Sequence, residues 1–203
     1  MIPPYPEIES VVLPKTGQTT AFLGDTIELD GHDLDGSNLT LLLANTRAAV
    51  AQTRPAASAT ASVVKFGLPI DPVGYPAGIY GVTLQVQRPG DPATRLTLSN
   101  EVAMAIAPQI TSFGKAVNAA GDLVVTPTCQ PQVRPTQRVS LILGDREVIA
   151  EPFNLATPTP SFVFSGLPNG TYWMRLRVDG ADSPLIDRSV SPPVFNAPQV
   201  AVP

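Results

Sequence analysis

Residues 166–178 read GLPNGTYWMRLRV, a Leu-Pro turn and a Gly followed by a Tyr and an alternating run. A related stretch in the first half combines GLP at 67–69 with AGIYGVTLQVQ at 77–87, after a short insertion. One face of the two runs carries only apolar and aromatic residues: Tyr80, Val82, Leu84, Val86, Tyr172, Met174, Leu176 and Val178. Because a period of two is typical of a half-buried β-strand, both stretches predict strands.

The two stretches belong to a longer internal repeat. Residues 109–113 (QITSF) echo residues 7–11 (EIESV), and each segment follows a Pro. Further echoes come in the same order in both halves: 24–27 with 121–125, 39–43 with 139–143, and 61–66 with 160–164. The period is roughly 100 residues, which indicates two copies of one module and not a solenoid.

Strand-like runs separated by turn signals, without a convincing helix, predict an all-β fold of two tandem immunoglobulin-like β-sandwich domains. The predicted parts are an extended Pro-rich lead-in at 1–6, a first sandwich at 7–107 and a second sandwich at 108–203. The boundary lies at Pro108. The insertion at 70–76 is predicted to lengthen a turn of the first sandwich.

Three local features are predicted in addition to the strands. Tyr80 and Tyr172 stand near the start of the penultimate strand of each half, where immunoglobulin-like folds place a corner tyrosine whose hydroxyl bonds back to the backbone. Residues 44–60 are rich in Ala, which favours helix, and are predicted to form a loop with one short helical turn. Residues 88–92 (RPGDP) are predicted to form a hairpin loop.

The composition excludes several classes of function. Charged residues make up 15% of the chain and the net charge is −4 without a block of like charges, so we expect neither a nucleic-acid footprint nor a polybasic membrane patch. No apolar run reaches the ~18 residues of a membrane span. The N-terminus lacks the pattern of a secretion signal, which favours a cytoplasmic location. The single Cys129 excludes an internal disulfide.

Acidic residues near the first turn cluster are the nearest approach to a calcium site, because Ca²⁺ prefers several oxygens from one loop. They are Asp25, Glu28, Asp30, Asp33 and Asp35. The following Gly36 comes too early for the twelve-residue calcium loop, and no Glu closes it. Turn chemistry explains the cluster better, so we predict neither a metal nor a cofactor site.

Catalytic chemistry has few residues to use. His32 is the only histidine and Cys129 the only cysteine, and they lie in different halves. A catalytic thiol or serine needs a base beside it, and no Gly-x-Ser-x-Gly motif accompanies the histidine. We therefore expect no enzymatic activity.

Trp173, Arg175 and Arg177 are the candidate interaction residues. They point to the face of their strand opposite to Met174 and Leu176. An outward Trp beside arginines has the composition of an interaction hot spot. The alternative is that Trp173 packs under its own loops or against the first module, with arginine stems over it.

Two resemblances to known families add to these inferences. Residues 24–34 (GDTIELDGHDL) resemble the second strand and turn of immunoglobulin-like modules of the plexin/transcription-factor type. Residues 138–148 (RVSLILGDREV), 166–172 (GLPNGTY) and 175–185 (RLRVDGADSPL) together resemble the C-terminal immunoglobulin-like extension of the cap, or tail-terminator, family of bacterial contractile injection systems. These systems are phage-tail-like particles.

The second resemblance implies a function. It implies a non-catalytic accessory module of a larger assembly, which attaches to a protein partner or a surface. Any release from the cell would then be as part of a particle. No segment matches the N-terminal capping domain of that family, so the resemblance implies the extension alone. The family has no catalytic residues to carry over.

The rival interpretation is a carbohydrate- or peptide-binding immunoglobulin-like pair of a cell-surface or secreted bacterial protein. Exposed aromatic residues would carry that binding, and the candidates are Trp173, Tyr75 and Tyr5. A small-molecule ligand is the less favoured of the two kinds of partner. A third route to partners is the open edges of the sandwich sheets, which are able to accept a strand from another chain. The Pro-rich ends at 3–6 and 192–203 tend to blunt such edges.

Overall fold

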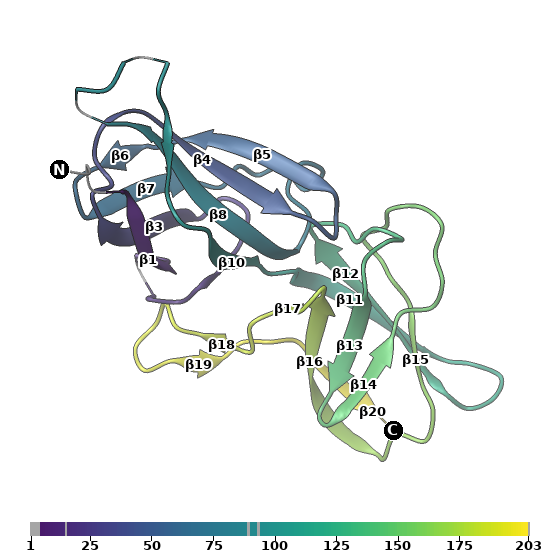
Figure 1. Ribbon diagram of the computed structural model, residues 1–203. Helices are drawn as coiled ribbons and strands as arrows, with labels where there is room; N and C mark the ends of the chain where they lie inside the picture. The colour runs from purple at the N-terminus through teal and green to yellow at the C-terminus, as the bar shows by residue number, and fades with distance from the viewer. Residues whose placement is uncertain (1–4, 15, 89, 93, 203) are drawn as a thin grey trace. The chain divides into compact units, whose positions relative to one another are not determined.

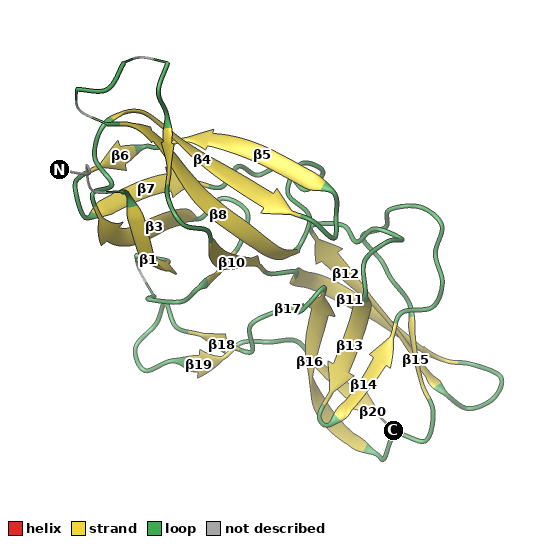
Figure 2. Ribbon diagram, in the orientation of Figure 1, coloured by secondary structure: helices red, strands yellow, loops and turns green. Residues whose placement is uncertain are grey.

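The computed structural model describes residues 5–14, 16–88, 90–92 and 94–202. Strands and loops make up these residues, and none of them is helical (Figure 2). No helix of the described segments is long and apolar enough to cross a membrane. Most of the predicted lead-in (residues 1–4), together with Pro89 and Pro203, lies outside the described residues. The all-β prediction is confirmed.

The chain divides into two compact units. Unit 1 comprises Met1–Ile70 and Ile79–Ile106, and unit 2 comprises Asp71–Gly78 and Ala107–Pro203. Residues 71–78 therefore belong to unit 2 and do more than lengthen a turn of the first sandwich. Within unit 2, the side-chain amide of Gln137 donates to the carbonyl oxygen of Ala77 at 2.8 Å, and Ala77 is part of the unit 2 core.

Unit 1 is a sandwich of two sheets (Figure 1). One sheet has the order β1 (Glu7–Val12), β3 (Thr26–His32), β7 (Val63–Gly67) and β6 (Ser58–Ala59). The other has the order β2 (Thr20–Ala21), β10 (Val102–Ile106), β8 (Gly78–Gln87), β4 (Ser37–Asn45) and β5 (Val50–Pro55), with β9 (Thr97–Leu98) paired to β8. This is the arrangement of an immunoglobulin-like sandwich, with strands A, B, E and D in one sheet and G, F and C in the other.

The predicted alternation fills the core of unit 1. The inward side chains of β8 are fully buried: Tyr80, Val82, Leu84 and Val86. The opposite sheet contributes side chains that are equally buried: Ile27, Leu29, Val64 and Phe66. Burial of such apolar side chains contributes about 1.5–3 kcal/mol each, which is the main source of stability here.

The prediction for residues 44–60 is wrong. They form the end of β4, a turn, and the strands β5 and β6, with no helical turn. β4 and β5 pair as a hairpin in which Asn45 lies opposite Val50, and the Asn45 side chain accepts a hydrogen bond from the Ala48 amide at 3.0 Å. Alternating exposure along β5 shows that pairing with β4 overrides the helix propensity of the alanines in this region.

Unit 2 repeats the same plan (Figure 1). One sheet has the order β11 (Gln109–Val117), β12 (Leu123–Gln130) and β15 (Phe162–Phe164). The other has the order β14 (Arg146–Ile149), β13 (Val139–Leu143), β16 (Gly170–Val178) and β17 (Ala181–Asp182), with β20 (Gln199–Val202) paired to β16. The segment between β17 and β20 forms a small hairpin of β18 (Ile186–Asp187) and β19 (Val194–Phe195).

The predicted corner tyrosine is present in unit 2. The hydroxyl of Tyr172 donates to the carbonyl oxygen of Pro168 at 2.8 Å, and this bond ties the start of β16 to the turn before it. Backbone carbonyls upstream are the partners that such tyrosines use in immunoglobulin-like folds. In unit 1 the corresponding Tyr80 is fully buried. In unit 2 the Leu-Pro turn and the tyrosine after it are thus joined by a hydrogen bond.

Replacement of Tyr172 by Phe is expected to lower the free energy of unfolding of unit 2 by about 0.5–1.5 kcal/mol, because it removes one hydrogen bond and little apolar contact. Urea denaturation of the two proteins measures this difference. Tyr5→Phe is the matched control on a tyrosine that is 65% exposed, and it should leave the midpoint unchanged. Equal midpoints for Tyr172→Phe and the native chain would show that the corner hydrogen bond contributes nothing.

Candidate functional site

The strand β16 places the candidate interaction residues as the sequence predicts. Met174, Leu176 and Val178 are fully buried, whereas Trp173, Arg175 and Arg177 are half-buried on the other face. Strand geometry accounts for this, because successive side chains point to opposite sides of the sheet. The face predicted for the three residues is therefore confirmed.

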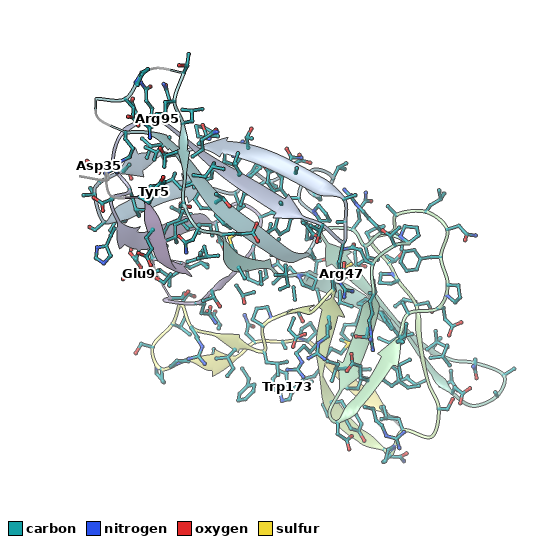
Figure 3. All side chains as sticks on the ribbon, viewed as in Figure 1. Tyr5, Glu9, Asp35, Arg47, Arg95 and Trp173 are labelled. Carbon is teal, nitrogen blue, oxygen red and sulfur yellow. The ribbon has the colours of Figure 1, made fainter. Side chains whose placement is uncertain are left out.

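Trp173 lies against a second aromatic ring. Its indole, labelled in Figure 3, stacks on Phe195 of β19, with 5.4 Å between the ring centroids and 29° between the ring planes. Trp173 thus packs under one of its own loops, which is one of the two alternatives left open by the sequence. Phe195 itself is 59% exposed, and Val194 beside it is 46% exposed. We call Trp173, Val190, Val194 and Phe195 the aromatic hairpin surface.

Sequence reasoning did not find Phe195. Strands of two residues carry no periodicity, so β18 and β19 leave no strand signal. The only available sign was the placement of Val194 and Phe195 after two prolines, in a segment otherwise suited to a surface loop. The stacking partner of Trp173 depends on how this loop folds back, which a local pattern does not encode.

The two arginines are engaged in ion pairs on the outer face of the sheet. Arg177 binds Asp182 through two hydrogen bonds, Nε to Oδ1 at 2.6 Å and Nη2 to Oδ2 at 2.9 Å. Its Nη1 also lies 3.2 Å from the Glu147 carboxylate. Arg175 approaches Asp182 at 3.5 Å, and its Nε is buried without a partner. The hydrogen bond with Asp182, more than any other contact, raises the pKa of Arg177 above its ordinary value.

This cluster is electrically balanced. Two guanidinium groups, of Arg175 and Arg177, face two carboxylates, of Asp182 and Glu147. The hydroxyl of Ser140 donates a hydrogen bond to the other carboxylate oxygen of Glu147, Oε1, at 2.6 Å. The outer face of β16 is therefore no cationic patch, and the arginines fix the sheet surface around Trp173 more than they offer charge to a partner.

The acidic residues of the first turn cluster all have protein partners. Asp25 accepts from the Phe22 amide, Glu28 pairs with Lys65 at 2.7 Å, and Asp30 accepts from the Ser10 hydroxyl. Arg88, with a side chain 12% exposed, lies 3.4 Å from the carboxylates of both Asp33 and Asp35. Within the described residues no group of three His, Cys, Asp or Glu side chains is placed to hold a metal ion.

The lone histidine and cysteine have structural surroundings. His32 lies 3.1 Å from Glu9, and both side chains are exposed. Cys129 is 3% exposed in the core of unit 2, and burial raises the pKa of its thiol to about 11. A thiol with this pKa is protonated at neutral pH and is a poor nucleophile.

Tyr75 and Tyr5, the two tyrosines proposed for ligand binding, differ in exposure. Tyr75 is 3% exposed, so it offers no ring to a ligand, and its assignment as an exposed aromatic is wrong. It lies in the segment Asp71–Gly78, which belongs to unit 2. Tyr5 is 65% exposed but lies in unit 1, whereas Trp173 lies in unit 2.

Comparison with known proteins identifies one family match and several structural likenesses. No curated protein sequence matches the chain. Solved structures similar to it include a segment of two fibronectin type III domains from chicken tenascin, with a TM-score of 0.42, 13% identity, and coverage of 98% of this chain and 100% of that one. A DUF4785 family protein from Legionella pneumophila has a TM-score of 0.35 and 12% identity, over 83% of this chain and 54% of that one.

A gamma-CGTase from the alkalophilic Bacillus clarkii has a TM-score of 0.38 and 12% identity, over 88% of this chain. The chain spans 24% of the length of that protein. Residues 108–201 match the model of a family described as a domain of unknown function (DUF8756). The matched residues include strands β11 to β19 of unit 2 and most of β20.

Proposed function

We propose that the chain is a non-catalytic interaction module whose unit 2 binds a protein partner through the aromatic hairpin surface. The observation that carries this proposal is the stack of Trp173 on a Phe195 that remains 59% exposed. Stacking restricts both side chains before any partner arrives, so less side-chain entropy is lost on binding. Buried aromatic anchors are the residues that most often dominate binding energy at protein interfaces.

The charges around this surface favour an apolar contact. Arg175 and Arg177 are paired with Asp182 and Glu147, so the cluster has no excess of either sign. The exposed residues Val190 and Val194 of the same segment, at 43% and 46%, are aliphatic. The partner that fits best is therefore a protein with an apolar surface and not an acidic one.

We propose further that this partner belongs to the end of a phage-tail-like contractile injection particle. Support comes from the resemblance of residues 138–148, 166–172 and 175–185 to the C-terminal extension of the cap family. In this role the chain would be an accessory part of the cap, made in the cytoplasm and released with the particle. Immunogold electron microscopy of a lysate from the native source tests the assignment. Gold at one end of the particles is expected, and gold on cell envelopes with none on particles would contradict it.

A rebinding assay tests the contact surface. Labelled chain is mixed with purified particles, and the fraction that sediments with them is measured. Trp173→Ala and Phe195→Ala are expected to weaken binding by roughly thirtyfold, the equivalent of a hot-spot loss of about 2 kcal/mol. Leu155→Ala is the matched control, because Leu155 is 81% exposed in the same unit. Equal binding by all three variants would locate the contact elsewhere.

A second candidate function is binding of a carbohydrate, favoured by the same stacked rings. Aromatic faces present an apolar surface of the kind that pyranose rings pack against, and Trp173 is the only tryptophan in the chain. Its fluorescence therefore reports on this surface directly. A saturable change in fluorescence with a glycan, abolished by Phe195→Ala, would support carbohydrate binding over the protein contact.

A further inference from the structure

Unit 2 has an open sheet edge at a place where unit 1 is closed by its own chain. In unit 1, β2 pairs in parallel with β10, with Thr20 opposite Ala105 and Ala21 opposite Ile106. The Ala105 amide donates to the Thr19 carbonyl oxygen at 3.4 Å. In unit 2 the last strand is β20, and within the described part of the chain it pairs only with β16 (Figure 1).

The two last strands correspond residue by residue. Residues 104–106 read MAI and residues 200–202 read VAV. Met104 and Val200 are both buried in the cores of their units, at 1% and 0% exposure. Ala201 of β20 is therefore the counterpart of Ala105, the residue that β2 binds in unit 1.

The ladder between β16 and β20 defines which backbone groups face the open edge. The Met174 amide donates to the Pro198 carbonyl oxygen at 2.8 Å. Hydrogen-bonded pairs alternate along an antiparallel ladder, so the next bonded pair is Tyr172 with Val200. The amides and carbonyls of Gln199 and Ala201 consequently point away from β16. The Ala201 carbonyl oxygen accepts a hydrogen bond from Lys115 Nζ at 2.8 Å.

One residue explains why unit 2 does not close this edge itself. In unit 1 the first strand, β1, ends at Val12, and Pro14 follows shortly after. Pro14 has no amide to continue the ladder, and the chain crosses to the other sheet as β2. The counterpart of Pro14 in the repeat is Ala116, and β11 continues alongside β12 as far as Val117. No residues of the first strand remain to reach β20.

We propose that the β20 edge accepts an extended segment of another polypeptide, which runs parallel to β20 in the place that β2 occupies on β10. The incoming backbone would accept from the Ala201 amide and donate to its carbonyl. The side chains of β2 indicate the chemistry of the partner, which is uncharged with a small residue pointing inward, as Ala21 does at 0% exposure. This inference is independent of the aromatic hairpin surface.

Lys115 protects this edge against strand pairing. Its ammonium group donates a hydrogen bond to the Ala201 carbonyl oxygen. Lysine side chains at sheet edges commonly protect against unwanted strand pairing. The incoming strand has to displace one exposed hydrogen bond. Lys115→Ala should therefore strengthen binding by roughly two- to tenfold, the equivalent of the net value of one hydrogen bond.

A peptide with the sequence of residues 17–23, GQTTAFL, is the probe. It is titrated into the isotope-labelled full chain, and the amide signals are followed by nuclear magnetic resonance. The Gln199 and Ala201 amides should shift and exchange more slowly with solvent, and contacts between peptide and β20 should have a parallel register. Ala201→Pro should abolish these effects, because it removes the outward amide and leaves the bonds to β16 in place. Ala201→Ser keeps the amide and is the matched control.

Three results would overturn the proposal. The first is peptide-induced shifts that map away from β20, or an antiparallel register. The second is unchanged binding by Ala201→Pro and Lys115→Ala. The third is protection of the Gln199 and Ala201 amides that rises with protein concentration in the absence of peptide, because a second copy of the chain would then be the occupant. If Ala201→Pro unfolds, the Lys115→Ala titration and the amide exchange rates still decide the outcome.

Discussion

Phe162→Ala is expected to lower the free energy of unfolding of unit 2 by about 3–5 kcal/mol. Phe162 is 0% exposed in the core of unit 2, and it lies opposite Val125 in the pairing of β15 with β12. Truncation removes most of a large apolar side chain and leaves a cavity between the two sheets. Urea denaturation followed by the fluorescence of Trp173 measures the change, because this tryptophan lies in the same unit.

Phe195→Ala provides the matched comparison, since it is the same substitution in the same unit. Phe195 is 59% exposed, and its stack on Trp173 is worth about 0.5–1.5 kcal/mol beyond the area that it buries. We expect a small loss of stability and a clear change in the emission of Trp173. A loss as large as that of Phe162→Ala would show that the hairpin belongs to the core, and it would remove the basis for a partner contact there.

The contrast between these phenylalanines bears directly on function. A core aromatic is explained by stability alone, so its presence says nothing about partners. Stability does not explain an aromatic residue that is mostly exposed and adds little to the free energy of unfolding. A single exposed aromatic residue is nevertheless ordinary on protein surfaces. Phe195 differs because its ring stacks on Trp173, in a segment that also exposes Val190 and Val194.

Much of the fold follows from local patterns in the sequence. The alternation in β8 and β16 predicts the inward residues of both units. The position of Tyr172 near the start of its strand predicts a hydrogen bond from its hydroxyl to the backbone, which the structure shows to Pro168. Local patterns fail where pairing decides the outcome. Residues 50–55 become a strand because β4 offers them a ladder, although the alanines in this region favour helix.

The candidate site was only partly predictable for the same reason. A period of two places Trp173 on the outer face, since that depends on the strand alone. The partners of Arg177 come from two other strands, Asp182 on β17 and Glu147 on β14, so the ion pairs depend on sheet order. The open edge of β20 requires the register between β16 and β20 as well, which no run of side chains encodes.

Above pH 9, the stability of unit 2 is expected to fall as the pH rises, in part through Cys129. Burial raises the thiol pKa from 9.0 to about 11 in the folded chain. Below pH 9 both states keep the proton, and the cysteine contributes no pH dependence. Between these two pKa values the unfolded chain loses a proton that the folded chain retains, so unfolding is favoured by up to about 1.4 kcal/mol per pH unit.

Cys129→Ala isolates this contribution from every other source of pH dependence in the same range. The difference in unfolding free energy between the native chain and the variant should be constant below pH 9 and should then shift against the native chain as the pH approaches 11. Urea denaturation of both proteins across this range measures the shift. A difference that stays constant would mean that the thiol ionises equally in both states, and water would then have to reach a side chain that the fold leaves only 3% exposed.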